Sequence, residues 1–492
     1  MSNIAVAEGK QWLQPGLFIC ALTLYIYKKR ARKCSNRGTS TERYARNLSK
    51  KQVLELRYKY FCRAQSISYE NSTPLFAKKA KGQYIYDECG NAYLDTRNNV
   101  GHVGWQNPVV SHAIQRQLHQ LNTNTRYIHH LRVALAKKLV ETLPKNLCQV
   151  FFVNSGSEAN DLALRLARTH TGKSDVIVVD HAYHGHTVAT IQISPYKYEH
   201  VGGPGQSTHT HKVPCPDTYR GIYTGSNAAE KYASHVKRAC EDVDVHRGLA
   251  AFFVESGMSV GGVIIPPKEY LKLSFDYVRK HGGVCIADEV QVGFGRVGKC
   301  YWGFQLSGVV PDIVTVGKPF GNGFPLAAVV TTRAISDSFA NGLEYFNTFG
   351  GNPIACAAGI AVLDVIEDMN LQQHALRVGT FIKHALQMLA AKAVGKAIGN
   401  VRGEGLFIGI EFVRNRESRI PATKLTSLIC SRLKERHKIL TSIDGPDHNV
   451  LVLKPPMCFT VANAKYFMEK LELELGQVSF GSSIENYSHT ST

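Results

Sequence analysis

The sequence predicts an α/β protein whose larger domain is built on a mainly parallel sheet. The chain has 492 residues, and from about residue 148 six short apolar runs alternate with helical patterns. Each run is continuous rather than alternating and ends in a turn with Gly, Ser or His, as expected for strands buried on both faces. Ligands of such sheets bind at one set of strand ends. The runs are Val150–Val153, Val176–Val179, Ala250–Val254, Val284–Ala287, Ile313–Val316 and Ala327–Val330.

Helical patterns and turns rich in glycine and proline then divide the chain. Leu162–Arg168 predicts a helix directly after a strand, and Ile354 to about Glu367 predicts a long helix that leaves the sheet. A smaller α+β domain follows, with strand patterns in Val401–Glu411 and Val450–Leu453. The predicted parts are a basic extension (1–54), an arm that contributes to the small domain (55–95), a large domain (96–350), a small C-terminal domain (351–475) and a flexible tail (476–492).

The net charge of +19 is concentrated at the N-terminus. Residues 1–60 hold 13 Lys/Arg and 3 Asp/Glu, so +10 lies there and +9 is left for the other 432 residues. This distribution argues against nucleic acid as a partner. The twelve cysteines form no C-x-x-C pair and no zinc-ligand spacing, so we expect reduced thiols and no metal site.

The N-terminal segment combines an apolar run with a basic cluster. Leu17–Tyr27 falls short of the roughly 20 residues that span a membrane, and Lys28–Lys33 follows it. A secretory signal carries its charges before the apolar core, so this order argues against secretion. The leader resembles a mitochondrial presequence and predicts a mitochondrial protein. The alternatives are a weak membrane anchor, which is the only membrane contact we expect, and a disordered extension of a cytoplasmic protein.

An acid and a lysine end two neighbouring apolar runs. The Asp288 carboxylate ends a buried strand, where it needs a cationic or hydrogen-bonding partner such as a pyridinium N–H. Lys318 follows the next strand in a glycine-rich loop. This pair is what pyridoxal 5'-phosphate (PLP) requires, because a lysine carries the cofactor as a Schiff base and a carboxylate keeps its ring nitrogen protonated. Glu289 points the other way along the strand and is expected to be structural.

Other turns offer further cofactor contacts, each with an ordinary structural explanation. The turn before the first helix contains Gly156 and Ser157, a pattern that suits a phosphate but is common in turns that bind nothing. Tyr183 ends the next strand and suits stacking on a flat ring, or a place in the core. Gln291 is a candidate for the ring oxygen, and Thr348 offers a hydroxyl in a glycine-rich turn.

The stretch Gly293–Gly298 matches G-x-G-x-x-G but does not indicate a dinucleotide site. Such a fingerprint should open a helix, and no helical pattern begins after Gly298.

Together these segments resemble the class III aminotransferases, a family of fold-type I PLP-dependent enzymes, over about residues 55–475. The resemblance implies that Lys318 bears the cofactor, Asp288 pairs with the ring nitrogen, and Gly156 and Ser157 hold the phosphate. It also implies that Tyr183 stacks on the ring, Gln291 contacts the ring oxygen and Glu255 supports the site. Thr348 would reach the phosphate of the neighbouring subunit's cofactor, which implies an obligate homodimer, with tetramers left open.

The reaction depends on how the substrate is held. In this family Lys318 would move a proton from the amine-bearing carbon and leave a stabilised quinonoid, which leads to transamination or to loss of a neighbouring leaving group. Arg402 is placed where relatives bind a substrate carboxylate. Relatives that act on ornithine mask this arginine with a glutamate, and Val260 stands at that position here. The substrate is therefore not expected to be of the ornithine type.

Several stretches resemble a narrower branch that contains alanine–glyoxylate aminotransferase 2-like proteins and phospho-lyases for ethanolamine phosphate and 5-phosphohydroxylysine. Basic residues in these stretches are candidates for a second anion site or are surface charges: Arg126, Lys197, Arg220 and Lys454. The leading hypothesis is elimination of phosphate from a small phosphoamine, which yields an aldehyde, phosphate and ammonia. The alternative is an alanine–glyoxylate transaminase. A non-catalytic paralogue is disfavoured because Lys318 and Asp288 are both present.

Overall fold

The computed structural model describes residues 39–70, 72–243 and 245–480, and the chain divides into two compact units between residues 76 and 77. The first unit contains α2 (Ser40–Arg46) and α3 (Lys50–Tyr60), each opened by a capping box at Thr39 or Ser49. The apolar and basic leader predicted from the sequence lies outside the described residues. No helix among the described residues is long and apolar enough to cross a membrane.

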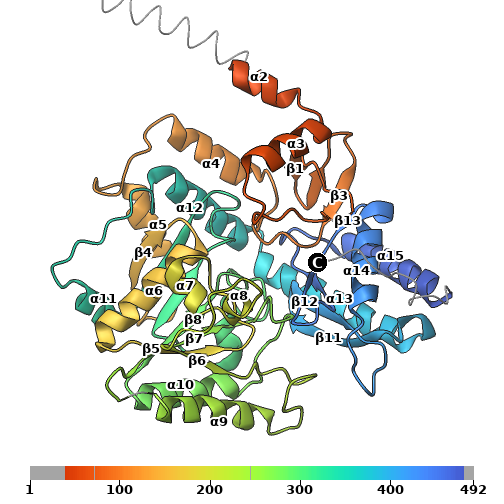
Figure 1. Ribbon diagram of the computed structural model, residues 1–492. Helices are drawn as coiled ribbons and strands as arrows, with labels where there is room; N and C mark the ends of the chain where they lie inside the picture. The colour runs from red at the N-terminus through yellow and green to blue at the C-terminus, as the bar shows by residue number, and fades with distance from the viewer. Residues whose placement is uncertain (1–38, 71, 244, 481–492) are drawn as a thin grey trace, which may run out of the picture. The chain divides into compact units, whose positions relative to one another are not determined.

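The second unit is built on a seven-stranded sheet with the order β4-β10-β9-β8-β7-β5-β6 (Figure 1). Strands from β9 to β6 pair in parallel, whereas β10 runs antiparallel to both of its neighbours. The predicted mainly parallel sheet is confirmed, and all six predicted runs are strands in it. Sequence reasoning missed β6, which is short and half polar. The strands are β4 (Gln149–Val153), β5 (Asp175–Val179), β6 (Thr210–Val213), β7 (Leu249–Glu255), β8 (Val284–Asp288), β9 (Ile313–Val316) and β10 (Ala327–Thr331).

Helices cover both faces of this sheet. Phe253 of β7 packs in a buried cluster with Leu162 of α6 (Gly156–Thr171). The adjacent Phe252 meets Phe275 of α10 (Tyr270–Lys280), with ring centroids 6.3 Å apart. Successive side chains of a strand point to opposite faces, so α6 and α10 lie on opposite sides of the sheet. Burial on both sides explains why the strands read as continuous apolar runs.

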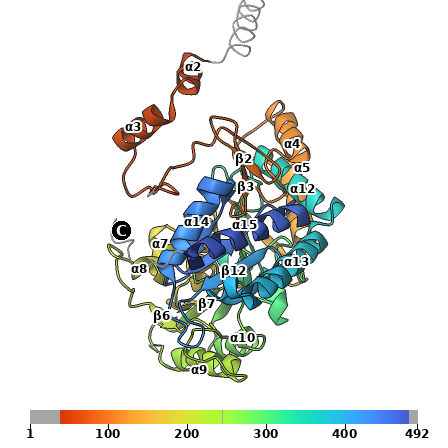
Figure 2. The ribbon, with the colours of Figure 1, turned by 90° about the vertical axis from the view of Figure 1, so that its right-hand side faces the viewer.

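The C-terminal part contains an antiparallel sheet with the order β11-β12-β15-β14. Figure 2 shows α13 (Leu371–Ala391), α14 (Thr423–His437) and α15 (Val461–Phe480) close together. The first two contact the sheet, and α15 packs against both of them. The stretch predicted at Val401–Glu411 is a hairpin rather than one strand. The chain reverses at Gly405, which has φ +55°, and a Cβ there would lie 2.4 Å from the Arg296 carbonyl oxygen. The strands are β11 (Ile398–Glu404), β12 (Phe407–Phe412), β14 (Ser442–Asp444) and β15 (Val450–Leu453).

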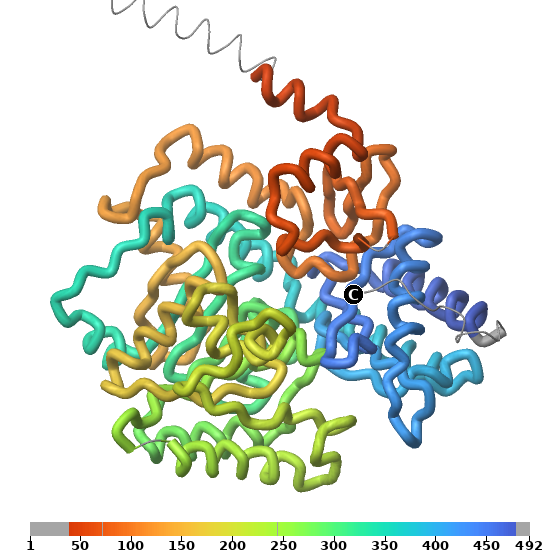
Figure 3. The backbone as a smooth tube through the Cα atoms, viewed as in Figure 1, coloured from red at the N-terminus to blue at the C-terminus, as the bar shows by residue number. Residues whose placement is uncertain are grey.

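A third sheet joins sequence-distant segments within the second unit. β1 (Lys79–Lys81), β2 (Tyr84–Tyr86) and β3 (Ala92–Asp95) form antiparallel pairs, and β13 (Ile439–Leu440) adds to β3 in parallel. Figure 3 shows these orange and blue segments side by side. The predicted arm thus pairs with a C-terminal strand, while the domain boundaries remain predictions.

The remaining helices connect these sheets. The helix predicted at Ile354 to Glu367 is α12, whose N-cap is Asn352. The helices that connect the sheets are α4 (Pro108–Leu118), α5 (His130–Glu141), α7 (Val188–Gln192), α8 (Pro195–Tyr198), α9 (Ala228–Glu241), α11 (Arg333–Phe339) and α12 (Pro353–Asp368), with the short 3₁₀ helices η1 (Gly303–Ser307) and η2 (Ala393–Gly395).

Candidate active site

A cavity of about 360 Å³ lies at the carboxyl ends of β4, β5, β8 and β9. Strands that end at the same edge of a parallel sheet bring their following turns together, although these turns are far apart in sequence. Six of the residues singled out in the sequence line this cavity: Gly156, Ser157, Tyr183, Asp288, Gln291 and Lys318.

The turn between β4 and α6 is shaped to receive an anion. Ser155 caps α6, so the first backbone N–H groups of the helix point out of its N-terminus beside the cavity. A Cβ on Gly156 would lie 3.0 Å from Val290, and one on Gly185, which has φ +139°, would lie 2.7 Å from the Ser157 hydroxyl. The close packing excludes side chains at both glycines. Only backbone groups line this edge of the cavity, which leaves room for a phosphate group.

Asp288 is held by three donors at the end of β8. Its Oδ2 accepts hydrogen bonds from Asn160 Nδ2 at 2.7 Å and from His184 Nδ1 at 2.9 Å, and its Oδ1 accepts one from the Val290 N–H at 3.0 Å. The residue is only 4% exposed. Sequence reasoning missed Asn160 and His184, although both lie in segments that it singled out. A carboxylate fixed by three donors at the end of a strand suits a partner for a ring N–H.

Glu255 does not line the cavity but supports its wall. One carboxylate oxygen accepts the Tyr183 N–H at 3.1 Å and the other accepts the Ser259 N–H at 3.0 Å. Burial, which is the largest effect, raises the pKa of Glu255 above its usual value. Gln291 accepts a hydrogen bond from Asn99 Nδ2 at 2.7 Å, a partner that the sequence did not suggest.

Lys318 has a lowered pKa of about 8 because burial penalises its ammonium form and the charge of Lys454 adds repulsion. Lys454 is itself buried, and burial lowers its pKa as well. Its Nζ donates to Ser259 Oγ at 2.7 Å and lies 3.6 Å from Asp444. Lys454 is thereby linked through Ser259 and Glu255 to Tyr183 in the cavity wall.

The lowered pKa of Lys318 gives a prediction for the cofactor-free protein. A neutral amine is the nucleophile, and at pH 7 a pKa of about 8 leaves roughly a tenth of the amine neutral, against less than about a thousandth for an ordinary lysine. The rate of PLP capture is expected to rise about tenfold per pH unit up to pH 8 and then level off. Stopped-flow absorbance measures this rate. Lys454→Met should move the plateau to higher pH, and a capture rate that still climbs at pH 10 in the unaltered protein would contradict the assignment.

The other singled-out residues lie outside the cavity wall. Thr348 is exposed on the loop before α12. Arg402 bonds the Gly262 carbonyl at 2.8 Å and forms an ion pair with Glu411. Glu289 accepts the N–H groups of Gly303 and Phe304, which agrees with the structural role expected for it.

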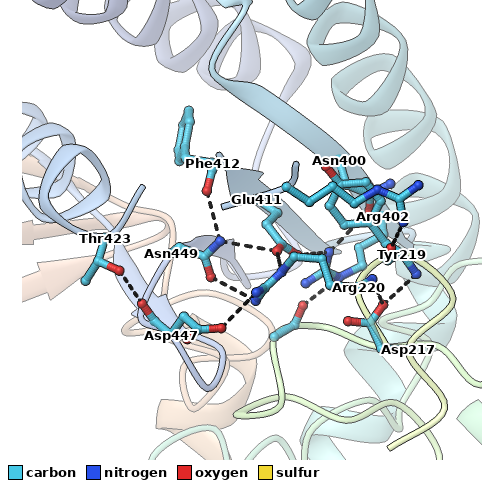
Figure 4. Close-up of polar contacts among 12 residues, drawn as sticks. Asp217, Tyr219, Arg220, Asn400, Arg402, Glu411, Phe412, Thr423, Asp447 and Asn449 are labelled. Carbon is cyan, nitrogen blue, oxygen red and sulfur yellow. Dashed lines mark hydrogen bonds and ion pairs between the residues drawn. The ribbon is translucent and has the colours of Figure 1, made fainter. Parts of the chain in front are cut away.

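Three of the four candidate basic residues have other partners. Arg126 pairs with the exposed Glu344, and Lys197 stacks over the Tyr196 ring at 4.8 Å. Arg220 pairs with Glu411 and Asp447 (Figure 4). Lys454 is bonded to Ser259 and close to Asp444, and its charge also acts on Lys318.

The described residues contain no group of three or more His, Cys, Asp or Glu side chains placed to hold a metal ion. The stretch Gly293–Gly298 forms turns, and the next element is the short η1.

Comparison with protein families matches residues 66–475 to aminotransferase class III. The chain belongs to the class III aminotransferases. It is therefore a PLP-dependent enzyme of fold type I that acts on small amines, and the residues lining the cavity fit that cofactor.

Similar proteins are named either as alanine–glyoxylate aminotransferases or as phospho-lyases. The chain is 47% identical to an alanine–glyoxylate aminotransferase 2-like protein of Drosophila melanogaster over 86% of both chains. It is 43% identical to ethanolamine-phosphate phospho-lyase homolog 1 of Caenorhabditis elegans, covering 84% of this chain and 91% of the relative. It is 39% identical to human mitochondrial alanine–glyoxylate aminotransferase 2 over 77% of both chains.

A solved structure also resembles this one. It is a phospholyase from Arthrobacter in complex with phosphoethanolamine, which is 37% identical with a TM-score of 0.82 and covers 86% of this chain and 99% of its own.

Proposed function

We propose that this aminotransferase-family enzyme eliminates phosphate from a small phosphoamine such as ethanolamine phosphate. The overall reaction takes up one water and yields acetaldehyde, phosphate and ammonia. The observation that carries the proposal is the second buried lysine, Lys454, which is linked through Ser259 and Glu255 to Tyr183 in the cavity wall. The names of the nematode and Arthrobacter relatives point the same way.

The cavity residues have distinct parts in this proposal. Gly156 and Ser157 hold the cofactor phosphate, Tyr183 stacks on the ring, and Gln291 contacts the ring oxygen. Asp288 pairs with the ring nitrogen, and Glu255 supports Tyr183. The bound cofactor supplies an electron sink for the carbon that loses a proton. Lys318 takes that proton, because its lowered pKa lets the neutral amine form near neutral pH.

Lys454 is the best candidate for the substrate phosphate. Burial lowers its pKa most; among the charges acting on it, Arg296 and Arg97 lower the pKa further, while Asp444 and Glu255 raise it. Arg296 is fully buried and bonds the carbonyls of Leu406 and Pro455 rather than a carboxylate. Lys454 is thus a buried cation near other cations, and an anionic substrate group beside it would relieve that repulsion.

Two incubations of the purified PLP-loaded protein test the function. Release of phosphate and ammonia from ethanolamine phosphate supports the lyase. Pyruvate and glycine from alanine plus glyoxylate would favour the transaminase alternative, to which the name of the human relative points. If neither reaction occurs with cofactor bound, both proposals fail for these substrates.

Lys454→Met is expected to raise the KM for ethanolamine phosphate roughly 10- to 100-fold, because a hydrogen bond from a charged donor is lost. Steady-state phosphate release measures this. Binding of ethanolamine, which lacks the phosphate, should be nearly unchanged. Lys299→Met is the matched control, since this lysine is exposed and paired with Glu404. Equal losses of affinity for ethanolamine phosphate and ethanolamine would show that Lys454 does not bind the substrate phosphate.

We also propose a homodimer in which Thr348 completes the neighbouring subunit's site. In support, Thr348 lies outside its own cavity wall, and Phe346 and Phe349 beside it are exposed apolar side chains. Mixing an inactive Lys318→Ala chain with an inactive Thr348→Asp chain should restore part of the activity, because one hybrid site then has both residues intact. Absence of activity in verified mixed dimers would contradict a shared site.

For localisation we propose the mitochondrion, supported by the basic leader and by the mitochondrial relative. A fluorescent fusion of residues 1–60 that stays diffuse in the cytosol would overturn this.

A further inference from the structure

The loop before α12 is bonded to the phosphate turn of its own subunit through Asn347. This side chain is half-buried, although Phe346 and Thr348 on either side of it are exposed. Its Nδ2 donates to Glu158 Oε2 at 3.0 Å, and its Oδ1 accepts a hydrogen bond from Asn154 Nδ2 at 3.1 Å. Asn347 thus joins the loop to residues that flank the proposed site of the cofactor phosphate.

Glu158 is the centre of this link. Its Oε2 also accepts hydrogen bonds from the backbone N–H and the side-chain amide of Asn154, each at 3.0 Å. Its own N–H donates to Ser155 Oγ at 3.2 Å, so the residue belongs to the first turn of α6, where the helix dipole favours a carboxylate. The helix N-terminus that we propose holds the cofactor phosphate therefore also positions the acceptor of Asn347.

Other contacts hold the loop against β4, the strand that leads into the phosphate turn. Tyr345 packs edge-on against Phe151 of β4, with ring centroids 5.9 Å apart. Gly350 donates its N–H to Asn347 Oδ1 at 3.0 Å, and a Cβ at Gly350 would clash with the Phe152 carbonyl oxygen. Because the loop is packed at both ends, a displacement of the phosphate turn is passed on through the loop rather than absorbed by it.

We propose that Asn347 is a positioning residue that couples the two cofactor sites of the dimer. Cofactor phosphate at Gly156 and Ser157 fixes the turn to which Asn347 is bonded. Asn347 then holds the adjacent Thr348 in the position that completes the neighbouring subunit's site. This inference rests on the proposed function for the homodimer and for the part that Thr348 plays. Coupling is reciprocal, so PLP in either subunit favours PLP in the other, by about tenfold.

Native mass spectrometry of the full-length dimer at half-saturating PLP tests the inference, because it separates empty, half-loaded and fully loaded dimers. Independent sites make half-loaded dimers about half of the population, and a tenfold coupling lowers that share to about a quarter. The unaltered protein should show about a quarter. Asn347→Ala should return the share to about a half whatever its overall affinity for PLP, because Thr348 remains but its link to the phosphate turn is lost.

Asn341→Ala is the matched control. Asn341 Oδ1 accepts the Leu343 N–H at 3.2 Å within the same exposed segment, and this bond does not reach the phosphate turn. Its half-loaded share should stay at about a quarter. Thr348→Ala changes an exposed side chain, so folding does not depend on it, and it should give the same share as Asn347→Ala. The double variant should show no additional change, because both replacements interrupt one path.

Two results contradict the inference. A half-loaded share of about a half or more in the unaltered dimer would overturn the coupling, and a share of about a quarter in Asn347→Ala would overturn the role of Asn347. The loading measurement involves no turnover, so it is separate from the proposed function. Failure of the lyase appears in the two incubations, and failure of the shared site appears in the mixed dimers of Lys318→Ala and Thr348→Asp chains.

Discussion

Replacement of Lys318 by alanine is expected to lower turnover by at least about 10⁴-fold, because the residue has two tasks. We propose that it bears the cofactor and that its amine then moves the proton that starts the reaction. The variant should also lose the absorbance of protein-linked PLP and yield no lysine adduct after borohydride reduction and mass spectrometry.

Lys299→Ala is the matched control, since this lysine belongs to the same unit but is exposed and paired with Glu404. It should keep both the adduct and the activity. Added methylamine should restore part of the turnover of Lys318→Ala, because a free amine takes over proton transfer. An alanine variant that kept the protein-linked absorbance would refute the assignment of Lys318.

Asp288→Asn is expected to reduce turnover roughly 10²- to 10⁴-fold while PLP remains bound. A neutral amide cannot stabilise a protonated ring nitrogen, so the carbon acid loses its electron sink. The change also replaces an acceptor of the Asn160 and His184 donors, which are buried at this position. Steady-state kinetics and the pH dependence of the cofactor spectrum measure the two effects.

Glu289→Gln is the control for Asp288→Asn. Glu289 is the neighbouring buried acid, with its pKa raised by burial to about 7, and it accepts the backbone N–H groups of Gly303 and Phe304. It should change thermal stability without changing how the cofactor spectrum depends on pH. Equal kinetic losses in the two variants would show that Asp288 has no specific role at the ring.

Local sequence was sufficient for much of the fold and for the cavity-lining residues. A polar residue directly after a continuous apolar run marks a strand end, and parallel strands bring such ends together. Tyr183, Asp288 and Lys318 could be identified in this way, and all three line the cavity. The hairpin at Gly405 was missed because its two strands read as one apolar stretch.

Partners of these residues could not be found in the same way. Asn160 and Asn99 approach Asp288 and Gln291 from positions 128 and 192 residues away in sequence. An asparagine in a helix or a loop has no local pattern that tells which carboxylate or amide it will meet.

The sequence by itself determined the family and predicted the residues that we propose carry its chemistry, because turn chemistry and strand ends are local properties. It could not rank the five basic residues Arg126, Lys197, Arg220, Arg402 and Lys454. A positive charge attracts any anion within reach, and only the folded chain decides which anion that is. The tertiary structure gives Arg402 and Arg220 the carboxylate of Glu411 and places Lys454 where its charge lowers the pKa of Lys318.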